Sequence, residues 1–157
     1  MCGIVGITSS KPVTSMILNS LRKLEYRGYD SSGIATLHDG NIHEVKSEGR
    51  VDALEKNLNR STLQGNIGIG HVRWATHGVP STINAHPHSS DNVSVVHNGI
   101  IENSTLLKKF LVSQGHKFKS QTDTEVIVHL ITENLKIDLD ASIGARHSIL
   151  LKMIQKY

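Results

Sequence analysis

Short apolar runs separated by polar, glycine-containing segments dominate the first half of the chain. Residues 3–8 predict a short buried strand, and apolar residues at three- and four-residue spacings from Val13 to Leu24 predict an amphipathic helix after it. Residues 33–38 and 42–47 predict two further strands. The Asp-Gly pair between these strands is typical of a tight hairpin turn.

The second half of the chain has the same mixture, interrupted by one long polar loop. The pattern predicts a weak helix over residues 51–59, a strand over 67–72 and the loop over 73–91. Another strand over 92–100 and an amphipathic helix over 103–115 follow. Thr122 and Glu125 fit a capping box at the start of a last helix. Hairpin strands with segregated helices favour an α+β fold over alternating βαβ units.

Composition and charge exclude several classes of function. A chain of 157 residues with 38% hydrophobic residues is long enough for one globular domain with a substantial core. Its net charge of +3 is small and its basic residues are scattered, so we expect neither nucleic acid nor an anionic membrane as a partner. No apolar run approaches the roughly 20 residues that span a bilayer. A single cysteine suits a reducing compartment, and we expect a cytoplasmic protein.

The single cysteine is the second residue of the chain, an unusual address for a structural thiol. One interpretation is a small buried side chain. The other is an N-terminal nucleophile, because removal of Met1 would leave Cys2 with a free α-amino group. Such an amine has an ordinary pKa of about 7.7–8.0 and can take the thiol proton near neutral pH.

Two further polar segments could contact a substrate. Arg73, in HVRWATHG, could clamp a carboxylate through its planar guanidinium, or it could be a surface arginine packed on Trp74. Asn98-Gly99, in VVHNGIIEN, suits a tight turn. An asparagine amide and a glycine N–H can also point at one spot, as the donors of an oxyanion hole must.

Asp123 and the pair His86 and His88 also allow two interpretations each. Asp123 could bind a substrate ammonium or simply belong to the start of a helix. His86 and His88 are two residues apart, so on an extended segment they would face the same way and suggest a zinc site. Zinc needs a third and usually a fourth ligand. The sequence has neither an HxxxH motif nor a second cysteine to supply them. We therefore expect no metal.

Six segments, taken in order, resemble one enzyme family: MCGIVG, LEYRGYDSSG, HVRWATHG, NAHPH, VVHNGIIEN and TDTEVI. They are similar to the glutaminase domain of glutamine–fructose-6-phosphate aminotransferases, which are class II glutamine amidotransferases of the N-terminal-nucleophile hydrolase superfamily. The resemblance runs from residue 1 to about residue 136. It implies an αββα sandwich of antiparallel sheets between helical layers. It also implies hydrolysis of L-glutamine to L-glutamate and ammonia without a cofactor.

The resemblance assigns a catalytic role to four residues of this chain. Cys2 would attack the side-chain amide of glutamine and form a thioester, which water would hydrolyse. Asn98 and Gly99 match the oxyanion hole of the family. Arg27, in the segment YRGYD, matches a residue that braces the nucleophile.

The resemblance also assigns residues that bind glutamine. Arg73 matches the group that binds the α-carboxylate, and Asp123 matches the group that binds the α-ammonium. Four residues match the loop that folds over bound glutamine: Trp74, Thr76, His77 and His86. The family's site uses no metal.

The resemblance ends before the chain does. We therefore expect the N-terminal part of an amidotransferase type 2 domain over residues 1–136 and a divergent tail over 137–157, which can be read as a short amphipathic helix. This division implies a sandwich truncated at its C-terminus. The isomerase domains that bind fructose 6-phosphate in the family are outside this chain, so a separate isomerase chain would have to use the ammonia. The alternative is a non-catalytic remnant that is unfolded or only binds glutamine.

Overall fold

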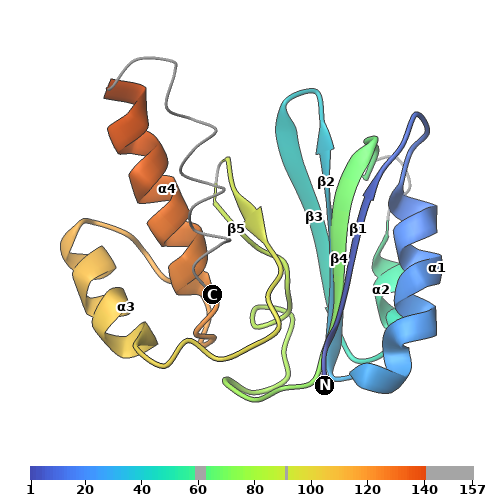
Figure 1. Ribbon diagram of the computed structural model, residues 1–157. Coiled ribbons are helices and arrows are strands. Elements are labelled where there is room, and N and C mark those ends of the chain that lie inside the picture. The colour runs from blue at the N-terminus through green and yellow to red at the C-terminus, as the bar shows by residue number, and fades with distance from the viewer. Residues whose placement is uncertain (59–62, 91, 141–157) are drawn as a thin grey trace.

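The computed structural model describes residues 1–58, 63–90 and 92–140, which form an α+β fold in layers (Figure 1). At its centre is a four-stranded antiparallel sheet with the strand order β1-β4-β2-β3. Its strands are β1 (Gly3–Thr8), β2 (Ser31–His38), β3 (Asn41–Glu48) and β4 (Ile67–Arg73). The α+β class predicted from the sequence is confirmed.

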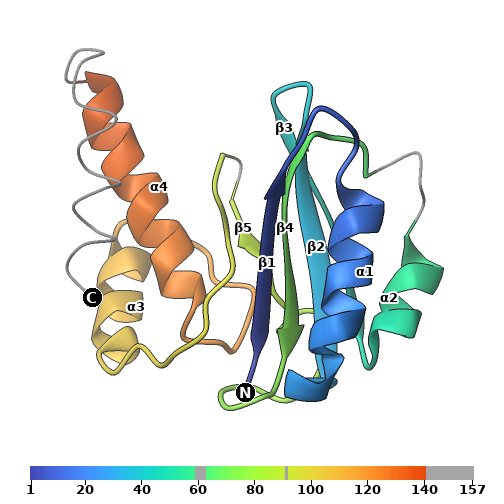
Figure 2. The same ribbon diagram turned by 45° about the vertical axis from the view of Figure 1, so that its right-hand side comes forward.

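Helices cover one face of this sheet, and a second, smaller layer of strands faces the other. The helices α1 (Thr14–Leu24) and α2 (Val51–Asn57) lie on the first face. On the opposite side lies an antiparallel pair, β5 (His88–Ser89) and β6 (Ser94–Val95), with α3 (Ser104–Ser113) and α4 (Glu125–Asp140) outside it (Figure 2). Within the described ranges, no helix combines the length and hydropathy needed to cross a bilayer.

The alternation of residues along β4 gives the large sheet two different faces. Gly70 faces α1, and a Cβ atom there would lie 2.4 Å from Cγ2 of Ile17, so glycine allows the helix to approach the strand closely. His71 and Arg73 project to the opposite face and are buried there. The sheet therefore has an apolar side under the helices and a polar side toward β5.

The main core lies between the sheet and α1 and α2. Its buried apolar residues come from both helices, from the strands and from the segment before β4: Val13, Ile17, Leu18, Leu21, Ile34, Val51, Leu54, Leu63 and Val72. Removal of these side chains from water is the main favourable term for this half of the fold. The apolar residues whose three- and four-residue spacing predicted α1 are thus the residues through which this helix packs on the sheet.

The predicted hairpin is confirmed with its turn. Asp39 and Gly40 have φ angles of 49° and 77°, and both positive values are what a two-residue type I′ connection requires. β2 and β3 pair antiparallel along their whole length, from His38 opposite Asn41 to Ser31 opposite Glu48.

Two predictions for the second half are wrong in detail. The strand predicted over residues 92–100 is reduced to Ser94–Val95, because the chain then leaves the ladder and turns toward the N-terminus of β1. The predicted capping box does not form. The Glu125 carboxylate accepts hydrogen bonds from the backbone N–H groups of Lys119 and Ser120, at 2.8 and 2.7 Å, instead of reaching back to Thr122.

The helix predicted over residues 103–115 is present, but half of its apolar face is exposed in the described structure. Leu111 is fully buried, whereas Leu106 is 69% exposed and Phe110 is 52% exposed. Periodicity thus predicted the helix correctly and overestimated the burial of its face.

The predicted boundary at residue 136 falls inside α4, which continues to Asp140. Residues 141–157, which hold most of the predicted divergent tail and its amphipathic helix, lie outside the described residues, as do residues 59 and 91 of the predicted helix and loop. The division of the chain at this point remains a prediction.

Gly33 offers a test of the contact between the two layers. A Cβ atom at Gly33 would lie 2.2 Å from the carbonyl oxygen of His86, whereas a Cβ atom at Gly6, in the same sheet, meets nothing within 4 Å. We expect Gly33→Ala to lower the free energy of unfolding by about 1–3 kcal/mol, because the 84–88 segment must move away from the sheet. Gly6→Ala should change it by less than about 1 kcal/mol. Equal effects in urea denaturation would contradict this account of the interlayer contact.

Candidate active site

The pairing of β1 with β4 brings the start of the chain beside the end of β4. Gly3 lies opposite Val72, so Cys2 comes next to Arg73 and Trp74. The backbone N–H of Trp74 donates a hydrogen bond to Sγ of Cys2 at 3.2 Å, and the thiol lies 3.5 Å from the carbonyl oxygen of Trp74. Cys2 is half-buried, so its thiol is held in place while remaining accessible.

Two side chains from distant segments meet the backbone of Cys2. Arg27, which ends a short 3₁₀ turn (Glu25–Arg27), donates from Nε to the carbonyl oxygen of Cys2 at 3.0 Å. Asn98 donates from Nδ2 to the same oxygen at 3.4 Å. Gly28 lies against the Arg73–Trp74 peptide, because a Cβ atom at Gly28 would be only 2.6 Å from the carbonyl carbon of Arg73.

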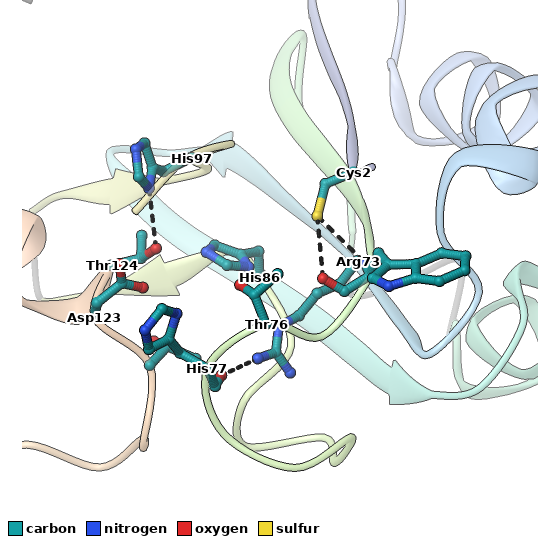
Figure 3. A pocket seen from close by; sticks show the side chains of 11 residues that line it. Cys2, Arg73, Thr76, His77, His86, His97, Asp123 and Thr124 are labelled. Atoms are coloured by element: carbon teal, nitrogen blue, oxygen red, sulfur yellow. Dashed lines mark hydrogen bonds between the residues drawn. The ribbon is translucent and has the colours of Figure 1, made fainter. Parts of the chain in front are cut away.

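Eight of the ten residues predicted from the resemblance line a single pocket (Figure 3): Cys2, Arg73, Trp74, Thr76, His77, His86, Gly99 and Asp123. The other two, Arg27 and Asn98, contact Cys2 directly. The pocket is built from the end of β4, the following loop, the segment after β6 and the turn before α4. Residues as far apart in the sequence as Cys2 and Thr124 therefore share one site.

Arg73 is the buried cation of this pocket. It is only 3% exposed, and one of its terminal nitrogens donates to the carbonyl oxygens of His77 and Gly78, with the Gly78 contact at 3.2 Å. Its other terminal nitrogen, NH1, is buried and has no hydrogen-bond partner among the described residues. Burial lowers the pKa of Arg73, although the negative charges of Cys2, Asp30 and Asp123 act in the opposite direction. A buried guanidinium with a free donor favours an anionic group in the pocket.

Asp123 supplies a negative charge to the same pocket. Its Oδ2 atom accepts a hydrogen bond from the backbone N–H of Ile101 at 2.6 Å, which fixes the carboxylate between two loops. Arg73 and Asp123 thus give one small pocket both signs of charge. This arrangement is complementary to the carboxylate and ammonium of an amino acid, with a thiol in reach of the same space.

Gly99 occupies a conformation that favours glycine. Its φ angle is +155°, and a Cβ atom there would lie 2.7 Å from Nε2 of His97. The segment after β6 can therefore pass close to His97, with Gly99 in the pocket wall.

Three residues of the pocket were not assigned to the site from the sequence: His97, Thr122 and Thr124. His97 and Thr124 contact each other, with Nδ1 and Oγ1 at 3.2 Å. His97 stands directly before the quoted Asn98-Gly99 pair, and Thr122 and Thr124 flank Asp123. Proximity to these motifs is the only signal in the sequence that could have indicated them.

Three buried histidines pack against one another as a histidine stack, and one of them, His86, also lines the pocket. The ring centroids of His71 and His86 are 4.3 Å apart, and those of His86 and His88 are 4.6 Å apart. Nε2 of His88 lies 2.9 Å from Oγ1 of Thr122, whereas neither ring nitrogen of His86 has a partner among the described residues. Within those residues, no group of three or more histidine, cysteine, aspartate or glutamate side chains is arranged to hold a metal ion.

Burial keeps this stack uncharged. It lowers the pKa of His71 to about 4 and that of His88 to about 4, and it lowers the pKa of His86 as well. A charged imidazole would lose its hydration here without gaining an anionic partner of sufficient strength.

Comparison with known proteins agrees with this geometry. Residues 57–144, more than half of the chain, match the model of the glutamine amidotransferase domain family. The chain belongs to this family. The family assignment made from the six sequence segments is therefore confirmed.

Individual relatives of this amidotransferase domain are aminotransferases. The chain is 53% identical over 148 residues to glutamine–fructose-6-phosphate aminotransferase (isomerizing) of Bartonella henselae, a match that covers 94% of this chain and 24% of the relative. It is 53% identical over 152 residues to the enzyme of the same name from Pyrococcus horikoshii, covering 96% and 25%. The chain thus spans about a quarter of the length of these relatives.

Solved amidotransferase structures share the fold. Glutamine phosphoribosylpyrophosphate amidotransferase from B. subtilis aligns with a TM-score of 0.71 and 31% identity over 84% of this chain and 29% of the other. A second structure, the allosteric regulatory enzyme of purine biosynthesis, aligns with a TM-score of 0.72 and 31% identity. The predicted N-terminal-nucleophile type of fold is confirmed by this likeness.

The neutral histidine stack predicts how stability depends on pH. Between about pH 6.5 and pH 4 the unfolded chain binds protons that folded His71 and His88 exclude, so the free energy of unfolding falls as the pH falls through this window. At about pH 5 the loss is on the order of 2 kcal/mol per histidine.

Replacement of one member of the stack isolates its contribution. His88→Gln keeps an amide near Thr122 but cannot titrate, so urea denaturation at pH 7.5 and pH 5 should show a smaller loss of stability than in the wild type. An equal loss in the variant and the wild type would show that His88 is not held neutral.

Proposed function

We propose that this chain hydrolyses the side-chain amide of L-glutamine and releases ammonia. The observation that carries the proposal is the common pocket of Cys2, Arg73 and Asp123, which combines a nucleophile with one partner for each charge of an amino acid. Arg73 would bind the α-carboxylate through its unpaired donor, and Asp123 would bind the α-ammonium. Trp74, Thr76, His77 and His86 would enclose the side chain.

The nucleophile would be activated by its own terminus. Met1 is 78% exposed, so its removal would cost little packing and would leave the α-amine of Cys2 free. That amine, directly or through a water, would take the thiol proton, and the thiolate would attack the amide carbon of glutamine. Arg27 supports this step by holding the carbonyl oxygen of Cys2 at 3.0 Å.

The tetrahedral intermediate would carry a negative oxygen between Asn98 and Gly99. The Asn98 amide and the Gly99 N–H are the two donors that would stabilise it. Collapse of this intermediate would break the C–N bond, and the ammonium of Cys2 would return its proton to the leaving ammonia. Water would then hydrolyse the γ-glutamyl thioester to glutamate and regenerate the thiol.

We also infer the use of the ammonia from the activity that names these relatives. In an isomerizing glutamine–fructose-6-phosphate aminotransferase, ammonia from glutamine aminates fructose 6-phosphate, which gives glucosamine 6-phosphate. The corresponding acceptor site would lie on a further domain or a separate chain. A cytoplasmic location is consistent with the single free thiol of Cys2.

The first test is glutamate release by the purified chain supplied with L-glutamine.

Asp123→Asn should raise KM for glutamine about 10- to 100-fold, because one charge-assisted contact to the α-ammonium is lost, and should change kcat less. Glu102→Gln, which removes an exposed carboxylate next to Ile101, the backbone partner of Asp123, is the matched control and should leave both constants near the wild-type values. Absence of glutamate with the wild type would contradict the proposed activity. An unchanged KM in Asp123→Asn would contradict the role of Asp123 alone.

A further inference from the structure

His71 is a fully buried polar side chain that the proposed reaction does not use. It projects from β4, one of the two inner strands of the large sheet, toward the side that carries the pocket, and it is 0% exposed. Its Nε2 atom lies 2.9 Å from Oδ1 of Asn98, a residue 27 positions later in the chain. Asn98 is itself exposed, so few contacts restrict the orientation of its amide.

The two neighbours of the Asn98 amide together select one orientation. The carbonyl oxygen of Cys2 can only accept a hydrogen bond, so the NH₂ group must face it, at 3.4 Å. The amide oxygen then faces His71, and this contact is favourable only if Nε2 of His71 carries a hydrogen. The other ring nitrogen, Nδ1, has no hydrogen-bond partner among the described residues. The arrangement therefore requires the Nε2–H tautomer.

The surroundings of His71 keep its ring uncharged. Burial lowers the pKa of the ring to about 4, and this outweighs the opposite effects of the hydrogen bond to Asn98 and of the neighbouring His97 backbone. The ring also packs on that of His86, with centroids 4.3 Å apart and planes inclined by 39°. At neutral pH the ring therefore carries a single N–H hydrogen. Packing against His86 fixes the position of the ring in the site.

The orientation of the amide matters for the proposed reaction. With the NH₂ group toward Cys2, the amide offers a donor where negative charge would develop on the glutamine oxygen. A flipped amide would turn its own oxygen toward that charge and repel it. Removal of a single oxyanion donor costs about 10²- to 10³-fold in kcat in enzymes of this kind of chemistry.

We propose that His71 is a positioning residue that holds the Asn98 amide with its NH₂ group toward Cys2. This inference rests on the proposed glutaminase function for its kinetic consequence. Its structural statement, the tautomer of His71 and its bond to Asn98, can be tested without any activity.

The structural test is a two-bond ¹H–¹⁵N correlation spectrum of the full-length chain near neutral pH. The His71 signals are identified by their loss in His71→Gln. They should have the pattern of a neutral ring with a hydrogen on Nε2, and they should shift in Asn98→Ala. A neutral ring with its hydrogen on Nδ1, which would make Nε2 an acceptor and reverse the Asn98 amide, would overturn the proposal whether or not the chain is active.

The kinetic test compares two replacements of His71. Glutamine can place an N–H near the position of Nε2, whereas asparagine is too short and places its amide near Nδ1. His71→Gln should retain kcat within about fivefold, and His71→Asn should lose about 100-fold, which corresponds to the loss of one oxyanion donor. In an Asn98→Ala background the two replacements should give the same kcat, because there is no amide left to orient.

The double variants separate positioning from general damage to the fold. If His71→Asn lowers kcat by the same factor with and without the Asn98 amide, His71 does not act through Asn98 and the proposal is wrong. If the wild type releases no glutamate, the glutaminase proposal fails, and the tautomer of His71 still decides the present inference.

Discussion

The pairing of β1 with β4 is the constraint on which the site depends. Because Gly3 lies opposite Val72, the second residue of the chain is placed beside the Arg73–Trp74 peptide, whose N–H binds the thiol at 3.2 Å. A shift of β1 by one residue in this register would turn Cys2 to the helical face and remove it from the pocket, while pairing with β2 would keep His71 and Arg73 in place. The buried apolar residues under α1 therefore also fix the position of the reactive end of the chain.

The polar face of the sheet carries a corresponding cost. Burying an arginine and three histidines between two layers is unfavourable unless their charges and hydrogen bonds are satisfied. The histidines avoid the cost of a buried charge by remaining neutral, although both ring nitrogens of His86 lack hydrogen-bond partners among the described residues. Arg73 bonds to carbonyl oxygens of its own loop, with one donor left for a ligand. Gly33 allows this packing, since any side chain there would meet the His86 carbonyl oxygen. The same packing that positions the site makes its stability sensitive to pH.

Local patterns in the sequence predicted most of the first half of the fold. The hairpin at Asp39-Gly40 and the helix over residues 14–24 depend on nearest neighbours and on one apolar face, which periodicity reports directly. The segment after β6 depends instead on contacts with the distant N-terminus, so its apolar residues were mistaken for a longer strand. Glu125 was assigned to a cap for a similar reason: its partners, Lys119 and Ser120, lie in a preceding loop whose course the sequence does not specify.

The residues of the candidate site could be named from six motifs, but their mutual contacts could not. Alternation in β4 does imply that His71 and Arg73 share a face, and this signal was available in GIGHVR. The bond from His71 to Asn98 requires knowledge of how the second layer lies on the sheet.

The central claim is that Cys2, the only cysteine of the chain, forms a covalent bond to the γ-carbonyl of glutamine. The most direct measurement is an intact-mass spectrum, followed by mapping of the N-terminal peptide, on protein quenched in acid during turnover of L-glutamine. We predict loss of Met1 and a γ-glutamyl group on Cys2 that disappears when glutamine is exhausted. Release of glutamate by protein that retains Met1, or by Cys2→Ala, would contradict this claim.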